Sequence, residues 1–598
     1  MKYNLKAFND AVKYYENCLA QYKGKTFFAV LDVRDEKAFF ALAPFSRAVH
    51  NLKGDLSVSI IQEKSEALDA LMDVWNAYEL LKKGVKNKVT ISLNDFIDMV
   101  DKKAKGGFRK IFKKPDAFVS SDNKGFIISN GKGNTLKLRL RPEWFRKYRW
   151  DDLMVTNRII WSQLYNIKKN EKVGIGFDLI AKADDIEYPL EDYLDSYALV
   201  RTAFLSCPAR KKALKASSVR KTMLEEGERI GELSSTLLGC ELDKNIDEPV
   251  FKRFKKLSSL LRLNRFKAND AAFFIKGEGY AGKHLFGEVI GYPTLNKKSR
   301  WDSPGGIIYQ LPWSPQTKID NRPPLCRLGF TDTLPIDIFI ESCKIDWLKM
   351  KKDDDALIKK VSQSDKIVVD SGKTNFEVFL IGKNNKRREP LGSDVDVRHK
   401  LDPKCLKKGI KAGTYANVPG GEMFVTPEYM KGTLYGDVVI SIDKSYVLSK
   451  KNPLVVKFDE KGYKIVGGPK SVIKKINEKK NEAMKVLLKQ EKHKSLPQEI
   501  IDMKKKNFNK IGEFAINTNP KARLCNYLIV NEKIAGMIHV ALGSGFEDDR
   551  PTVYHYDIVI NAKEQKLDIY GVKKEKAKGG KPVKEKKLWM MKKGKLVV

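Results

Sequence analysis

The sequence predicts two kinds of fold in one chain, an α/β domain at the N-terminus and a β-rich α+β domain at the C-terminus. Near the N-terminus, apolar strand-like runs alternate with segments that carry apolar residues at helical spacing. Such alternation is typical of a parallel sheet with crossover helices. From about residue 300 onward, short strand-like runs are separated by turns that contain Gly and Pro. We therefore expect mainly antiparallel pairing in that part.

The first domain is predicted to span residues 1–100. Its opening segment, MKYNLKAFNDAVKYYEN, mixes charged and apolar residues as an amphipathic helix does. FFAVLDV and LSVSIIQ are strand candidates, and the helical patterns that follow them cover residues 36–51 and 65–83. No GxGxxG follows the first strand, so the sequence does not support dinucleotide binding.

Residues 101–300 form a mixed α/β region whose role the sequence does not indicate. Short strands are predicted between residues 118 and 140, because SDNKG and NGKGN are turn signals. Residues 209–238 carry apolar side chains at helical spacing. The Gly-rich stretch GEGYAGKH, residues 277–284, lacks Walker A spacing and is interpreted as a loop.

The C-terminal domain is predicted to span residues 301–572. KIVVDSGKTNFEVFLIGKNNKR predicts a hairpin around a Ser-Gly turn. Residues 471–506 are highly charged and helical in pattern, with a break at Pro497. Residues 573–598 are a Lys-rich basic tail, which we expect to be disordered as far as LWMM.

Composition limits the class of protein. The chain has 598 residues, 42% of them hydrophobic, and a net charge of +38. Its Lys residues are spread through every region and mixed with Glu and Asp, so we expect a solvated cationic surface, and do not expect nucleic acid as the main partner. The seven Cys form no CxxC pair, which indicates reduced thiols. Since no apolar run could span a bilayer and no signal peptide is evident, we expect a cytoplasmic protein without a membrane partner.

A possible metal site lies near the end of the chain. Residues 553–560 are β-branched and aromatic, which favours a strand, and His555 and Asp557 at i and i+2 would share one face. His539 is the single polar residue of a second apolar strand candidate, where a His needs a partner. Two imidazoles and a carboxylate can bind Zn, Co, Mn or Fe(II). A hydrogen-bonded His–Asp pair without a metal would have the same spacing.

Two glutamates stand in similar contexts. Glu422 directly follows Gly420-Gly421, where a backbone can approach a ligand closely, and Glu513 lies in GEFAINTNPKA. The blocks NVPGGEMFVTPE, GEFAINTNPKA, GMIHVALGSG and YHYDIVI, in this order, resemble the aminopeptidase T / aminopeptidase S family of metallopeptidases, also called thermophilic metalloproteases. They are also similar to the related 2,5-dihydroxypyridine dioxygenases. The resemblance covers the C-terminal third and leaves residues 100–300 unaccounted for.

The resemblance implies a fold class, a function and a ligand set. The fold class becomes an α/β N-terminal domain plus an α+β, β-rich C-terminal metal-binding domain. The function it implies is a metal-dependent aminopeptidase, a hydrolase that removes N-terminal residues from peptides by two-metal activation of water. Two divalent ions (Zn, Co or Mn), a homodimer and a general base supplied by Glu422 or Glu513 are also implied. The implied metal ligands are Glu422, Glu513, His539, His555 and Asp557.

One position departs from the family pattern. The peptidases have a catalytic Tyr seven residues after the first His ligand, and this chain has Phe546 there. Phe cannot donate a hydrogen bond to an oxyanion. Tyr554, Tyr556 or a Lys could replace that donor, or the peptidase chemistry could be altered.

Two other functions therefore stay open. The dioxygenase branch uses one Fe(II) held by two His and one Asp, which here would be His539, His555 and Asp557. A non-catalytic member that binds a polyanionic partner through its basic surface is the third interpretation.

Overall fold

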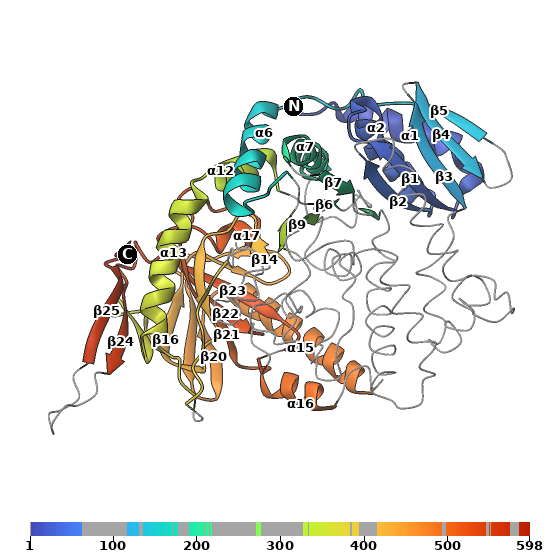
Figure 1. Cartoon of the computed structure of the whole chain (residues 1–598). Coiled ribbons are helices and arrows are strands. Elements are labelled where there is room, and N and C mark those ends of the chain that lie inside the picture. The colour runs from blue at the N-terminus through green and yellow to red at the C-terminus, as the bar shows by residue number, and fades with distance from the viewer. Residues whose placement is uncertain are drawn as a thin grey trace, which may run out of the picture. The chain divides into compact units, whose positions relative to one another are not determined.

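The computed structural model of the chain (Figure 1) forms two compact units. Described residues up to Ile340 belong to the first unit, and those from Glu341 to Val598 to the second. The structure describes residues 2–61, 116–122, 124–130, 135–169, 172–177, 190–208, 210–213, 216–217, 271–276, 327–332, 334–382, 385–393, 415–492, 498–545, 549–550, 552–574 and 585–598.

The first sheet of the N-terminal unit confirms the predicted α/β start. Its order is β5-β4-β3-β1-β2-β8, and β1 pairs in parallel with β2 through the crossover helix α2. β3 is parallel to β1, whereas β4 and β5 continue as antiparallel strands. The helix expected over residues 65–83 lies outside the described residues. The elements are α1 (Leu5–Cys18), β1 (Thr26–Asp32), α2 (Glu36–Asn51), β2 (Asp55–Ile61), β3 (Ala117–Asp122), β4 (Gly125–Asn130), β5 (Thr135–Arg139) and β8 (Ala216–Ser217).

A second, parallel sheet follows in the same unit. The strands β10, β9, β6 and β7 lie side by side in that order. Residues 210–213 and 216–217, predicted as part of a helix, are strands instead, because pairing with β6 and β2 overrides a local helical pattern. The Gly-rich stretch 277–284 lies outside the described residues. The elements are α6 (Trp150–Ile159), β6 (Lys172–Phe177), α7 (Leu190–Ser206), β7 (Arg210–Ala213), β9 (Ala271–Lys276), β10 (Arg327–Asp332) and α12 (Ile336–Cys343).

Two antiparallel sheets build the C-terminal unit. The eight-stranded sheet has the order β20-β19-β16-β12-β11-β24-β25-β26, and the seven-stranded sheet has the order β13-β15-β21-β22-β23-β17-β18. The strands of the first are β11 (Lys366–Asp370), β12 (Asn375–Phe379), β16 (Tyr429–Gly436), β19 (Leu454–Asp459), β20 (Gly462–Gly467), β24 (Asp568–Lys574), β25 (Glu585–Lys592) and β26 (Lys595–Leu596). Those of the second are β13 (Leu391–Gly392), β15 (Glu422–Val425), β17 (Val439–Ser441), β18 (Ser445–Val447), β21 (Ile511–Asn517), β22 (Ile538–Gly543) and β23 (His555–Ile560).

The helices of this unit flank the sheets. The predicted break in the charged helical segment separates α15 from α16, and Pro497 itself lies outside the described residues. In Figure 1, α13 runs along the sheet strands, and contacts join it to β13 and β15. The helices are α13 (Trp347–Ser362), α15 (Lys470–Lys492), α16 (Gln498–Lys506) and α17 (Leu528–Asn531), and β14 (Tyr415–Asn417) leads into the Gly-Gly turn.

One hydrophobic cluster joins the two sheets. The central strands of both sheets alternate between a side chain that enters this cluster and one that points to the opposite face. Burial of these apolar side chains is the main force that fixes strand register. Cluster members from the eight-stranded sheet include Ile367, Val369, Phe376, Val378 and Met430, and those from the seven-stranded sheet include Met423, Phe514, Ile516, Val540 and Ile558.

Part of the C-terminal segment that was expected to be disordered is a strand. Glu585–Lys592 forms β25, which pairs with β24 although the segment is rich in Lys. Met590 and Met591 are fully buried, and Lys587 lies over the ring of Tyr570 at 4.3 Å from its centroid. The apolar residues of LWMM and cation–π contacts therefore hold this segment as a strand. Among the described residues, no helix is long and apolar enough to cross a membrane.

Candidate metal centre

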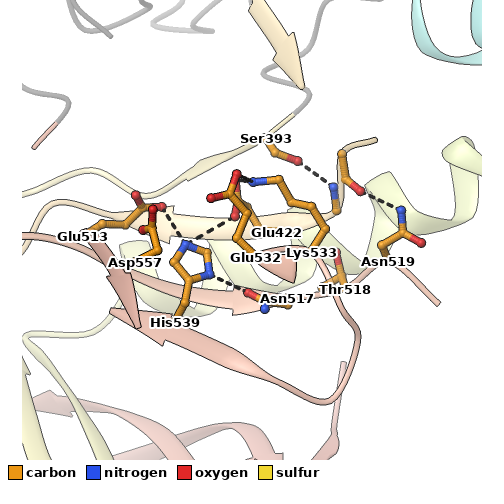
Figure 2. A network of polar contacts seen from close by, with 12 residues as sticks. Ser393, Glu422, Glu513, Asn517, Thr518, Asn519, Glu532, Lys533, His539 and Asp557 are labelled. Carbon is orange, nitrogen blue, oxygen red and sulfur yellow. Dashed lines mark hydrogen bonds and ion pairs between the residues drawn. The ribbon is translucent and has the colours of Figure 1, made fainter. Parts of the chain in front are cut away.

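The predicted ligands lie on four neighbouring strands of the seven-stranded sheet. In that sheet β15, β21, β22 and β23 are adjacent and antiparallel. All five point to the face opposite the hydrophobic cluster, since their strand neighbours Met423, Phe514, Val540, Tyr556 and Ile558 belong to it. Figure 2 shows four of the side chains converging. The five residues are Glu422 on β15, Glu513 on β21, His539 on β22, and His555 and Asp557 on β23.

Strand register sets the spacing of the ligands. Ala541 is paired with Glu513 on one side and with Asp557 on the other, and Gly543 is paired with His555. Side chains directly opposite in an antiparallel pair lie about 5 Å apart. Ala and Gly at the intervening positions place no bulky side chain between the carboxylates and the imidazole.

The five side chains form two groups that share Glu513. Each group offers ligand atoms that lie within 4.8 Å of one another: Glu422, Glu513 and His539 in the first, and Glu513, His555 and Asp557 in the second. Glu513 Oε1 lies 3.3 Å from His539 Nε2, whereas Glu513 Oε2 lies 3.3 Å from His555 Nε2. Glu513 is therefore placed as a carboxylate between two groups of ligands.

Buried oxygens without donors indicate that these residues fit a cation. Among the described residues, neither Oδ2 of Asp557 nor Oε2 of Glu422 accepts a hydrogen bond, although both side chains are almost fully buried. His555 Nε2 lies at ion-pair distance from Asp557, 3.2 Å. Leaving buried carboxylate oxygens unsatisfied is costly, and coordination to a divalent ion would satisfy them. Imidazole and carboxylate donors suit Zn, Co, Mn and Fe(II).

Both imidazoles are oriented through their second nitrogen. His539 Nδ1 lies 2.8 Å from Asn517 Oδ1, and His555 Nδ1 lies 2.7 Å from the carbonyl oxygen of Ser544. Donation from each Nδ1–H to these oxygens leaves Nε2 facing the carboxylates. Such partners fix the tautomer and ring orientation of metal-binding His.

Gly512 makes the contact to Ser544 possible. The register of β21 shifts between Ile511 and Glu513, so that Gly512 lies at an irregularity of the ladder. A Cβ on Gly512 would overlap the carbonyl oxygen of Ser544. The absence of a side chain therefore allows that oxygen to reach His555.

The Gly-Gly turn positions Glu422 at the start of β15. Gly421 has φ +121° and donates its N–H to Ser393 Oγ at 2.7 Å. Asn519 Nδ2 donates to the carbonyl oxygen of Gly420 at 2.9 Å, and Thr518 N donates to that of Gly421 at 2.8 Å. The close backbone approach expected from the Gly pair is thus present, and its immediate partner is Asn519.

Sequence reasoning missed two charged residues next to the site. Lys533 is buried, with Nζ 2.5 Å from Glu422 Oε1 and 2.8 Å from Glu532 Oε1. Figure 2 shows the ammonium between these two carboxylates. The segment NEKIAG has no sequence pattern that would predict burial of this Lys and Glu, and the chain contains many other Lys and Glu residues.

The charges of the site perturb one another. Burial raises the pKa of Glu422 to about 7, against the opposing effect of Lys533. Burial also acts to raise the pKa of Glu513, but hydrogen bonds and charge from the two imidazoles outweigh it and lower that pKa to about 2. Burial acts to lower the pKa of His539, whereas Glu513 and the other carboxylates raise it to about 9. Without a cation, protonated imidazole therefore balances Glu513.

The possible replacements for the catalytic Tyr of the peptidases lie in different places in the structure. Phe546 lies outside the described residues. Tyr554 and Tyr556 belong to the hydrophobic cluster, and the hydroxyl of Tyr554 lies 2.9 Å from that of Tyr463. Neither Tyr faces the ligands, because both lie on the core side of their segment. The suggested replacement by Tyr554 or Tyr556 is therefore wrong, and among the described residues Lys533 lies beside the site.

No protein-family model matches this chain, and no curated protein matches it. One similar solved structure is that of wild-type AmpT from Thermus thermophilus. It has a TM-score of 0.40 and 11% sequence identity, and the match covers 75% of this chain and 100% of that one.

Proposed function

We propose that this protein is a metal-dependent aminopeptidase that removes N-terminal residues from peptides with two divalent ions. The observation that supports it is the position of Glu513, whose two oxygens face two different imidazoles. That arrangement suits a carboxylate that bridges two ions. The resemblance of the four sequence blocks to the aminopeptidase T / aminopeptidase S family supplies the reaction type.

Each residue has a role in this proposal. Glu422, Glu513 and His539 would hold one ion, and Glu513, His555 and Asp557 the other. Bound there, the ions would lower the pKa of a coordinated water and stabilise the charge that develops on the carbonyl oxygen. The nearby small residue Ala541 keeps the region between the carboxylates free of a large side chain.

Glu422 is the better candidate to accept a proton from the attacking water. Both oxygens of Glu513 face imidazole nitrogens, so an ion-bridging Glu513 has no oxygen left for a proton. Glu422 Oε2 has no hydrogen-bond donor among the described residues, and burial favours the protonated form of this carboxyl group. In the proposal Glu513 is a ligand, and Oε2 of Glu422 takes the proton when it is not bound to the ion, because Lys533 holds the other oxygen of Glu422.

The dioxygenase alternative has less support. A single Fe(II) site would need His539, His555 and Asp557 around one point. Glu513 stands between the two imidazoles instead, at 3.3 Å from each. A fourth ligand, and a second carboxylate, in that position favours two ions over one.

Elemental analysis combined with a peptidase assay tests the proposal. We expect about two divalent ions per purified chain, and release of N-terminal residues from short peptides that is lost on chelation and restored by Zn, Co or Mn. Glu513→Gln should lose both ions and activity, with Glu377→Gln, a glutamate on β12, as the control. Full peptidase activity in the metal-free protein would contradict the proposal, and one iron per chain would favour the dioxygenase.

A further inference from the structure

Lys533 is built into the candidate metal centre. It follows α17 by two residues, and its side chain is 1% exposed. The backbone carbonyl of Lys533 accepts the N–H of Asn519 at 2.9 Å, and the side chain of Asn519 donates to the carbonyl of Gly420. One residue, Asn519, therefore ties the segment that carries the ammonium to the turn that carries Glu422.

The ammonium engages only one of the two ligand groups. Lys533 Nζ contacts Oε1 of Glu422 at 2.5 Å, while Oε2 of the same carboxylate lies 3.6 Å from His539 Nε2. Glu422 thus has one oxygen held by a fixed cation and one oxygen directed to the ligand group. In the other group, the neighbour of Asp557 Oδ1 at 3.2 Å is Nε2 of His555, which is itself a predicted metal ligand and not a fixed cation.

Charge makes the two ion positions unequal. An ion at the Glu422 position would share its carboxylate with a positive charge that cannot leave for solvent, because Lys533 is enclosed. Like charges a few ångströms apart repel strongly in a buried setting. An ion held by Asp557 and His555 meets no such direct competition for its carboxylate in the described part of the chain.

We propose that Lys533 is a positioning residue that restricts Glu422 to one metal-binding oxygen and makes the ion position of Glu422, Glu513 and His539 the weaker of two. This inference rests on the proposed two-ion function. The position formed by Glu513, His555 and Asp557 fills first, and the position next to Lys533 exchanges its ion more readily.

Calorimetric titration of metal-free protein with Co²⁺, followed by visible absorption, tests the inference without any substrate. The unchanged protein should bind two ions with affinities that differ by about tenfold or more, the range typical of changes around metal ligands. Lys533→Met should tighten the weaker position by about tenfold and leave the tighter one nearly unchanged. Lys533→Arg, which keeps the charge, should retain the original difference.

The control and the second variant separate this effect from damage to the fold. Lys351→Met removes another buried ammonium, which pairs with Asp355 on α13, and should leave both affinities unchanged. If Lys533→Met does not fold, Glu532→Gln combined with Lys533→Met removes both members of the pair and should show the same tightening. A damaged site would bind ions more weakly, so tightening is not expected from misfolding.

The outcomes distinguish the two proposals. The inference would be overturned if the unchanged protein bound two Co²⁺ ions with equal affinity. It would also be overturned if Lys533→Met left the Co²⁺ affinity of the weaker position unchanged or lowered it. Either result would leave the proposed two-ion function standing. No Co²⁺ bound by the unchanged protein would overturn the proposed function, and the inference with it.

Discussion

Asn519 occupies the space that a side chain on Gly421 would need. An ideal Cβ on Gly421 would lie 2.7 Å from both the backbone nitrogen and the Cβ of Asn519. Real Cβ atoms do not approach other atoms that closely, so the two segments fit together only because residue 421 is Gly. The turn before Glu422 is therefore held at a fixed separation from Asn519, whose N–H donates to the carbonyl of Lys533.

Gly421→Ala should destabilise the protein and weaken metal binding together. The overlap with Asn519 and the left-handed backbone at φ +121° should lower the free energy of unfolding by about 3 kcal/mol. Denaturant unfolding and Co²⁺ titration measure the two effects. Gly372→Ala is the matched control, because Gly372 has φ +80° but no atom within 4 Å of an added Cβ. Equal losses in the two variants would show that contact with Asn519 has no role.

Glu513→Gln should remove more metal than Asp557→Asn. Glu513 contributes to both ligand groups, whereas Asp557 contributes to one. We expect about one ion per chain after Asp557→Asn and fewer than one after Glu513→Gln, measured by elemental analysis of the folded variants. Retention of one ion by both variants would contradict a shared carboxylate.

Ala541→Leu should block metal binding with the fold preserved. The larger side chain would enter the space between Glu513 and Asp557, at an overpacking cost of about 1–3 kcal/mol. Near-UV circular dichroism and elemental analysis measure fold and metal content. Ala562→Leu, at a fully buried position of the hydrophobic cluster, should have a similar cost but keep the ions. Metal loss in both variants would point to general loosening instead.

Lys480 should make stability rise at alkaline pH. Its Nζ lies 4.6 Å from the ring centroid of Tyr463 and 2.8 Å from Asn509 Oδ1, and burial lowers the pKa of Lys480 to about 8. Between pH 8 and the ordinary Lys pKa of about 10.4, the unfolded chain binds the proton that the folded chain has lost, so this group adds stability as pH increases.

Comparison with Lys480→Met isolates that contribution. The difference in free energy of unfolding between the variant and the unchanged protein should favour the variant most near pH 7 and diminish towards pH 10. Denaturant unfolding at several pH values measures it. A difference that does not change with pH would show that Lys480 keeps its ordinary pKa.

The arrangement of the ligands followed from the sequence only in part. The i and i+2 spacing predicted that His555 and Asp557 share a face, and β23 confirms it. The approach of Glu422, Glu513 and His539 depends on the pairing of β15, β21 and β22, which no local pattern specifies. The prediction that these three residues lie together came from the resemblance to the aminopeptidase T / aminopeptidase S family.

Other features had no usable signal in the sequence. Lys533 and Glu532 reach the site through the segment that follows α17, and a buried Lys cannot be told from a solvated one by its neighbours in NEKIAG. Tyr554 and Tyr556, two of the possible replacements for the hydrogen-bond donor that Phe546 lacks, flank His555 in the sequence. In a strand, however, the residues that flank a ligand point to the opposite face.

The alternation of ligands and core residues along β15, β21, β22 and β23 also guards against incorrect pairing. A slip of one residue in any of these strands would turn carboxylates and imidazoles inward and expose Phe, Ile and Val on the opposite side. Mispaired forms of this sheet therefore carry a heavy electrostatic and solvation penalty before any ion arrives. The side chains proposed to bind metal therefore also disfavour incorrect strand register while the sheet folds.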